Sequence, residues 1–209
     1  EVLEVKELKD IEPLNNQVRI KVHYAGINFA EIMARMKLYP GGPKPGSVLG
    51  GEVSGVIDKI GKDVEGLSLG EKVMGLSLNG SYSSQVCIDA NSIIKLPENF
   101  KLDEAAAFPV VYITAYMMMF DLGNLREDEI FFIQGAGGGV GTAAIQLAKA
   151  VGAKIIGTSS EWKHERLKEM GVDLCVDYTK DNVKEKIMNY TNGYGVDLII
   201  DPVGGKQWS

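Results

Sequence analysis

The chain has 209 residues, and 22 Lys and Arg against 28 Asp and Glu give it a formal net charge of −6 at pH 7. This length allows one or two domains, and an acidic balance without a basic stripe argues against capture by nucleic acid or an anionic membrane. Apolar residues at 45% and charged residues at 24% exclude a disordered chain, a collagen and a disulfide mini-scaffold. Glycine is in excess, with 25 residues, about 12% against a usual ~7%. Because no Gly/Ser tract is present, the excess predicts many tight turns and close backbone approaches.

Two cysteines and one long apolar stretch bear on the compartment and the membrane class. Cys87 and Cys175 each lie inside an apolar run, so we expect buried, reduced thiols, as in a cytoplasmic protein. No signal peptide is visible, and the apolar stretch 105–120 is too short to span a bilayer and contains Pro109. We expect one packed helix there, no integral membrane segment and no nucleic-acid partner.

The first half of the chain, up to Pro109, alternates in twos and is punctuated by turn residues. Val18, Ile20 and Val22 lie two residues apart, which predicts one face of a strand. Turn signals separate further short apolar runs. The pattern predicts a mainly β domain, a candidate small barrel, with strands at 18–22, 52–60, 72–75 and 85–88 and a short helix at 29–36.

After Pro109 strands and helices alternate. Gly152 and Gly171 each follow a run with helical periodicity and provide C-terminal stops. A repeated β-α unit predicts a parallel, doubly wound sheet. The expected strands are 130–134, 154–158, 174–177 and 196–201, and the expected helices are 140–151, 161–170 and one carrying Val183, Ile187 and Tyr190.

A glycine-rich turn, residues 135–141, joins the first of these strands to its helix. Positions 136, 138 and 141 fit G-x-G-x-x-G with Ala at the first place. The motif gives a tight turn, backbone open to a pyrophosphate, and close contact between helix and strand. In this strand–turn–helix context it predicts dinucleotide binding, with the pyrophosphate at the helix N-terminus. The alternative is a purely structural glycine turn.

The end of the second strand decides the choice of cofactor, because an NAD site places Asp or Glu there for the 2′-hydroxyl. This chain has Thr158, two serines, Glu161, Trp162 and Lys163 in that region. Serine hydroxyls donate hydrogen bonds, and the Lys163 ammonium is able to reach back to a 2′-phosphate. One charge-assisted contact contributes ~1.5–3 kcal/mol, and ~1.4 kcal/mol is tenfold in affinity. Glu161 is counter-evidence, although carboxylates are common in a first helical turn. We expect NADPH in preference to NADH.

Several motifs together resemble one family. They are residues 25–31, 38–40, 50–52 with Gly55 and Gly61, 114–116, the glycine turn and 201–205. Over essentially its whole length the chain resembles the zinc-free quinone oxidoreductase (zeta-crystallin-like) branch of the medium-chain dehydrogenase/reductase superfamily. Residues 28–40 and 112–125 look closest to the synaptic-vesicle-protein homologues within that branch.

The resemblance implies an α/β protein with two domains. A GroES-like β-barrel domain is expected over residues 1–113, and a Rossmann dinucleotide-binding domain with a doubly wound parallel sheet over residues 114–209. Both are expected to be incomplete, with only the first four Rossmann strands and a bare edge on the fourth. We therefore expect this chain to be aggregation-prone and weakly active at best.

The resemblance also implies cofactor-binding residues. Gly138, Gly139 and Val140 match the turn that binds the pyrophosphate. Lys163 matches a residue that contacts the 2′-phosphate, and Tyr178 one that packs by the adenosine end. Ser159 is added because it follows the second strand and carries a hydroxyl.

Three further positions match residues lining the nicotinamide or substrate cleft. These are Asn28, Tyr39 and Thr114; Asn28 and Thr114 are expected to contact the cofactor, and Asn28 and Tyr39 are the candidate catalytic residues. Each has a plainer interpretation, in which Asn28 is a turn residue, Tyr39 a surface aromatic and Thr114 a helix N-cap.

A zinc site of the family type is not expected. The positions matching the Cys, His and Cys ligands of the zinc alcohol dehydrogenases are Asn28, Gly51 and Val110, none of which offers a thiolate or an imidazole. Glu52 matches the acid beside the lost histidine, and we favour a structural role for it.

The predicted function is hydride transfer from NADPH to a quinone or an α,β-unsaturated carbonyl, without zinc. Such acceptors spread the developing negative charge, which a hydrogen bond from Asn28 or Tyr39 stabilises further. The expected partners are this small-molecule substrate and, at full length, a second copy in a homodimer. The alternative is a non-catalytic NADPH-binding interaction protein, vesicle-associated or structural.

Overall fold

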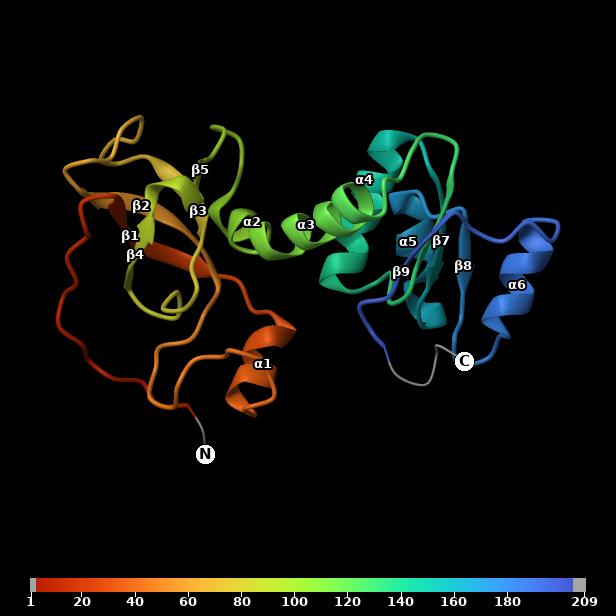
Figure 1. Ribbon diagram of the computed structural model, residues 1–209, viewed down its shortest axis with the longest axis horizontal. Helices are drawn as coiled ribbons and strands as arrows, with labels where there is room; N and C mark the ends of the chain where they lie inside the picture. Colours follow the sequence, from red (N-terminus) through yellow and green to blue (C-terminus); the bar gives the residue numbers. More distant parts are fainter. Residues whose placement is uncertain (1–2, 205–209) are drawn as a thin grey trace. The chain divides into compact units, whose positions relative to one another are not determined.

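A computed structural model describes residues 3–204 (Figure 1). The chain forms two compact units, Glu1–Val110 and Val111–Ser209. The assignment of domains to 1–113 and 114–209 stays a prediction, and Gly205 of the 201–205 motif lies outside the described residues. The elements in chain order are β1 (Gln17–Ala25), α1 (Phe29–Arg35), β2 (Glu52–Ile60), β3 (Lys72–Leu76), β4 (Gln85–Asp89), η1 (Ala90–Ser92), β5 (Ile93–Lys95), α2 (Leu102–Ala106), α3 (Pro109–Tyr116), η2 (Met117–Leu122), β6 (Ile130–Ile133), α4 (Gly139–Val151), β7 (Lys154–Thr158), η3 (Glu161–Lys163), α5 (His164–Met170), β8 (Leu174–Val176), α6 (Val183–Tyr190) and β9 (Leu198–Ile200).

The first unit is built on an antiparallel sheet with strand order β4-β1-β2-β3-β5. Alternate residues of β1 and β2 face one core, in which Val18, Ile20, Val53 and Ile57 are buried. The four predicted strands and the short helix are confirmed. Strand β5 was not predicted, because three residues are too few to show an alternation of polar and apolar side chains.

The single helix expected over residues 105–120 is wrong. Helix α2 ends at Ala106, α3 begins at Pro109, and the last turn widens into the π-helix η2. Pro109 has no N–H to donate backwards and its ring obstructs the preceding turn, so it starts a new helix at a first-turn position.

The second unit holds a parallel sheet with strand order β8-β7-β6-β9. This is the order of the first four strands of a doubly wound sheet, as predicted. Phe131 and Ile133 of β6 pack in the same cluster as α4 and α5, whereas Phe132 packs in the cluster that contains Ile187 of α6. Helices therefore cover both faces, which explains why these strands are apolar throughout.

The helix stops were predicted correctly. Gly152 ends α4 and Gly171 ends α5, with φ of 85° and 110°, in the left-handed region that favours glycine. The predicted helix 161–170 begins as the 3₁₀ turn η3 before α5. Cys87 and Cys175 are free thiols, but they are half-buried and not buried as expected. Desolvation raises the pKa of both thiols.

Replacing Phe131 by alanine tests the core of the second unit. Phe131 is fully buried between the sheet and the helices, so we expect a loss of ~3–5 kcal/mol in the free energy of unfolding. Urea denaturation followed by circular dichroism measures it. Ile199→Ala, on the neighbouring strand and 55% exposed, is the matched control and should cost about 0.5 kcal/mol or less. Equal losses in the two variants would contradict this placement of the core.

Candidate functional site

The glycine-rich turn is fixed by strand β7. The N–H of Gly135 donates to the hydroxyl of Thr158 (3.1 Å), and the N–H of Ala136 donates to the carbonyl of Thr158 (2.9 Å). Gly135 has a φ of +67°, and Gly138 is the N-cap of α4 without a side-chain cap. The turn therefore presents the N-terminus of a 13-residue helix with no side-chain acceptor on it, the arrangement that binds anions.

Close backbone contact explains why glycines occupy this turn. A Cβ on Gly141 would lie 2.4 Å from the carbonyl oxygen of Gly135, and one on Gly139 would lie 2.9 Å from Cγ1 of Val111. A side chain at position 141 would push α4 away from the backbone of the turn, and one at position 139 would displace Val111. The turn thus fits the pyrophosphate of a dinucleotide.

Lys163 packs on the same turn. Its Nζ lies 3.4 Å from the carbonyl oxygen of Gly137, and its Cδ would be 2.6 Å from a Cβ added there. The ammonium also lies 5.0 Å from the centroid of the Trp162 ring. The structure therefore brings together the cation and the glycine turn, which the sequence places 26 residues apart.

The two serines after β7 differ in orientation. Ser159 is 4% exposed and its hydroxyl donates to the carbonyl of Ser160. The Ser160 hydroxyl lies 3.4 Å from the hydroxyl of Tyr178, whose ring is 45% exposed. Ser160 and Tyr178 thus form a polar pair at this edge of the sheet, whereas the predicted Ser159 turns inward.

Asp177 was missed by the sequence analysis and organises the end of β8. Its carboxylate accepts hydrogen bonds from the hydroxyl (2.7 Å) and the N–H (2.9 Å) of Thr179, and from the N–H of Glu161 (3.3 Å). Donation by Thr179 lowers the pKa of Asp177. An Asp followed two residues later by Thr is an Asx-turn signal that was available in the sequence.

Glu161, the counter-evidence against NADPH, forms an ion pair with Lys180. The Glu161 carboxylate raises the pKa of Lys180. The negative charge of Glu161 is therefore balanced by a cation from the segment after β8.

The first unit gathers Asn28, Gly51 and Val110, the three positions that match zinc ligands in the zinc enzymes. Glu52 accepts from Nδ2 of Asn28 (2.7 Å) and from the N–H of Val110 (2.9 Å). Glu31 accepts from the N–H of Asn28 (2.7 Å) and from the N–H of Gly51 (3.1 Å). Two carboxylates thus tie these positions together by hydrogen bonds.

The residues at this place do not fit a zinc ion. A carboxamide, a glycine and a valine offer no thiolate or imidazole, and both carboxylates already accept N–H donors. Within residues 3–204, no group of three or more His, Cys, Asp and Glu side chains is arranged to hold a metal ion. Burial raises the pKa of Glu52, and the hydrogen bonds from Val110 and Asn28 oppose that rise.

The plainer interpretations of the three cleft residues fare differently. Asn28 is the N-cap of α1, and its carboxamide is also bound by Glu52. Tyr39 lies in the turn after α1 with its ring 48% exposed. Thr114 lies inside α3, so it is not an N-cap; it shares a helix face with Val111, which approaches Gly139.

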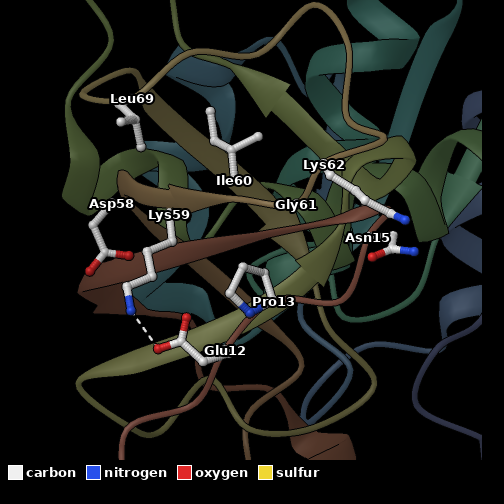
Figure 2. Close-up of a pocket in the computed structure, with 9 residues that line it drawn as sticks. All are labelled: Glu12, Pro13, Asn15, Asp58, Lys59, Ile60, Gly61, Lys62 and Leu69. Atoms are coloured by element: carbon white, nitrogen blue, oxygen red, sulfur yellow. Dashed lines mark hydrogen bonds and ion pairs between the residues drawn. The ribbon is translucent and has the colours of Figure 1, made fainter.

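A separate cavity of about 510 Å³ lies in the first unit and includes none of the predicted site residues (Figure 2). Three of the four charged residues that line it form ion pairs, and Lys62 is the fourth. Lys59 binds Glu12, and Asp58 binds the guanidinium of Arg19 at 2.9 and 3.0 Å. The cavity presents backbone and aliphatic surface between these pairs and carries no assigned role.

Two protein-family models match most of the chain. Residues 14–98 match the alcohol dehydrogenase GroES-like domain, and residues 139–209 match the zinc-binding dehydrogenase family. The synaptic vesicle membrane protein VAT-1 homolog of Danio rerio is 40% identical over 195 residues, 92% of this chain and 40% of that protein. The chain belongs to the medium-chain dehydrogenase/reductase superfamily.

Solved structures of two reductases are similar to this chain. The Escherichia coli quinone oxidoreductase complexed with NADPH matches with a TM-score of 0.91 and 32% identity, over 97% of this chain and 63% of that one. The CurK enoyl reductase matches with a TM-score of 0.92 and 28% identity, over 97% and 64%. These matches support the quinone oxidoreductase-like branch. The chain spans less than two thirds of the length of each of these proteins.

None of the helices within residues 3–204 has the length and apolar character needed to cross a bilayer.

The lowered pKa of Asp177 makes a prediction about pH. The stabilisation from its hydrogen bonds should be complete above its unfolded pKa of about 3.9 and should disappear as the pH falls through the lower folded value. We expect Asp177→Asn to lower the urea midpoint at pH 7, and the gap to the wild type to narrow steadily as the pH falls below about 3.9. Asp121→Asn, at an exposed carboxylate, is the control and should show no such gap. A gap for Asp177→Asn that stays constant with pH would contradict this role.

Proposed function

We propose that this chain binds NADPH on its second unit and takes part in zinc-independent hydride transfer to a quinone or an α,β-unsaturated carbonyl. One observation carries the proposal. The glycine turn leaves the N-terminus of α4 uncapped by any side chain, and Lys163 places a cation 3.4 Å from the carbonyl of Gly137. When bound, NADPH supplies the hydride from its nicotinamide ring.

The preference for NADPH over NADH rests on charge. Lys163 lies at the turn where a 2′-phosphate would be near, and Glu161 is occupied by Lys180 and not free to bind a 2′-hydroxyl. A quinone oxidoreductase of similar structure has been solved with NADPH. In this proposal Gly138, Gly139 and Val140 hold the pyrophosphate, and Ser159, Ser160 and Tyr178 lie at the adenosine end.

The acceptor is proposed from the chemistry of the first unit. With Asn28 and Tyr39 as hydrogen-bond donors and no metal, the protein stabilises a developing oxyanion only by hydrogen bonds. Conjugated acceptors suit such a site because they delocalise that charge themselves. Relatives of similar structure are a quinone oxidoreductase and an enoyl reductase. Thr114 is proposed to contact the cofactor, and the whole protein to be a cytoplasmic homodimer.

A second candidate function is an NADPH-binding interaction protein without turnover. The relative from Danio rerio is a synaptic vesicle membrane protein homolog, which favours this alternative.

Lys163→Glu tests the cofactor preference. Removing one charge-assisted contact of ~1.5–3 kcal/mol should weaken NADPH binding about ten- to a hundredfold, because the new carboxylate also repels the 2′-phosphate. Binding of NADH should change by less than about threefold. Fluorescence titration with both nucleotides measures this. Lys168→Glu, an exposed lysine on α5, makes the same charge change and should leave both affinities unaltered. Equal loss of NADPH and NADH in Lys163→Glu would contradict the proposal.

Turnover separates the two candidate functions. We expect NADPH oxidation, followed by its absorbance, with some members of a panel of quinones and enals, and no change in rate with a metal chelator. Binding of NADPH without oxidation by any acceptor would favour the interaction protein. Loss of activity with chelator, restored by Zn²⁺, would overturn the zinc-independent assignment.

A further inference from the structure

Glu52 is a buried carboxylate without a cationic partner among the described residues. It is 1% exposed, and no ion pair with Lys, Arg or His involves it within residues 3–204. Burying a carboxylate is costly unless hydrogen bonds satisfy it. Its two oxygens divide between two donors, Nδ2 of Asn28 and the N–H of Val110. A buried acid retained on these terms needs a reason beyond packing.

The surrounding backbone makes room for this carboxylate. A Cβ on Gly26 would lie 2.2 Å from Oε1 of Glu52 and 2.4 Å from the carbonyl oxygen of Ala106. Only glycine allows the chain before Asn28 to pass so close. Position 26 and position 52 therefore work as a pair to place Oε1 at the Asn28 side chain.

Asn28 is held at two points as a result. Its backbone N–H donates to Glu31 (2.7 Å), and its Nδ2 donates to Glu52 (2.7 Å). A carboxamide is planar and carries two N–H bonds on Nδ2, so fixing one of them fixes the direction of the other. The hydrogen bond to Glu52 therefore also sets the direction of the second N–H.

We propose that Glu52 is a positioning residue, which aligns the carboxamide of Asn28 so that its second N–H donates to the carbonyl oxygen of the hydride acceptor. This inference rests on the proposed function, because that function supplies the acceptor. It replaces the purely structural role expected for Glu52. No proton leaves Glu52, and no bond to it forms or breaks.

Glu52→Gln is the first test. Glutamine has one acceptor oxygen where glutamate has two, so one of the two donors loses its partner. We expect kcat to fall about ten- to a hundredfold, as for a misoriented catalytic group, with the KM for NADPH changed less than twofold. Asn28→Ala should lower kcat to a similar extent, and adding Glu52→Gln to it should cause little further loss.

A paired exchange separates positioning from simple stability. In the double variant Asn28→Asp/Glu52→Gln, the amide nitrogen introduced at position 52 donates to the carboxylate introduced at position 28. The amide oxygen at position 52 still accepts from the N–H of Val110. Both buried hydrogen bonds are restored, but the donor toward the acceptor is gone. We expect the melting temperature to recover and kcat to stay low. Recovery of kcat together with stability would overturn the proposal.

Ser54→Ala provides the matched control. Ser54 is fully buried on the same strand, β2, and donates to the carbonyl of Leu102. Its loss should lower the melting temperature without lowering kcat. A fall in kcat equal to that of Glu52→Gln would show that any loss of stability in β2 impairs turnover, and would overturn the specific role of Glu52.

A readout independent of turnover is the side-chain amide signal of Asn28 in ¹⁵N–¹H spectra, identified by its absence in Asn28→Ala. In the wild type one amide proton should be shifted downfield by the bond to Glu52, and in Glu52→Gln it should return toward the position of exposed amides. Unchanged shifts would overturn the inference whatever the activity. If the wild type shows the shift but none of the tested acceptors supports oxidation of NADPH, the proposed function fails while the alignment of Asn28 by Glu52 stands.

Discussion

Contact between the backbone of the glycine turn and the first residues of α4 determines what the second unit is able to bind. Gly141 lies so close to the carbonyls of Gly135 and Ala136 that no side chain fits between them. Thr158 holds the start of the turn through its hydroxyl and its carbonyl. With the helix fixed against the strand, its terminal N–H groups have no side-chain cap, and such groups attract an anion through the aligned peptide dipoles. The excess of glycine in the composition thus acquires a specific physical use.

In the first unit, two carboxylates and their hydrogen bonds organise the candidate site. Positions that carry metal ligands in zinc enzymes of the superfamily are held here by Glu31 and Glu52, which share Asn28 between them. A metal ion would organise such a site through its charge, whereas N–H donors and acceptors organise it through direction. Directional bonds position a single donor well but do not polarise an unactivated ketone strongly. Under the proposed function, this limit is the physical reason why conjugated acceptors suit the site.

The sequence predicted elements wherever a local pattern was long enough. The strand 52–60, the helix at 183–190 and the stops at Gly152 and Gly171 follow from periodicity and from glycine chemistry. The long apolar run around Pro109 hid the break there, because its hydrophobicity continues across the proline while the helix does not. The inward turn of Ser159 and the bond between Asn28 and Glu52 were not predictable, because each depends on a partner placed by the tertiary fold. The glycine turn was predictable from its motif, whereas the two hydrogen bonds by which Thr158 holds it were not, since the last residue of a strand gives no local sign of what it contacts.

Two glutamates show why residue type alone does not assign a role at this site. Glu161 is exposed, its charge is balanced by the ion pair with Lys180, and water screens what remains. Its charge therefore has little influence on a nearby phosphate. Glu52 is buried, and among the described residues it has no cationic partner. Its position is fixed by the hydrogen bonds it accepts from Asn28 and Val110, so it has a strong influence on the orientation of Asn28. The same functional group thus has a weak effect on its neighbours where water screens its charge, and a strong effect on their orientation where water is excluded. Burial, which the sequence indicates only through the apolar strand around Glu52, is what separates the two.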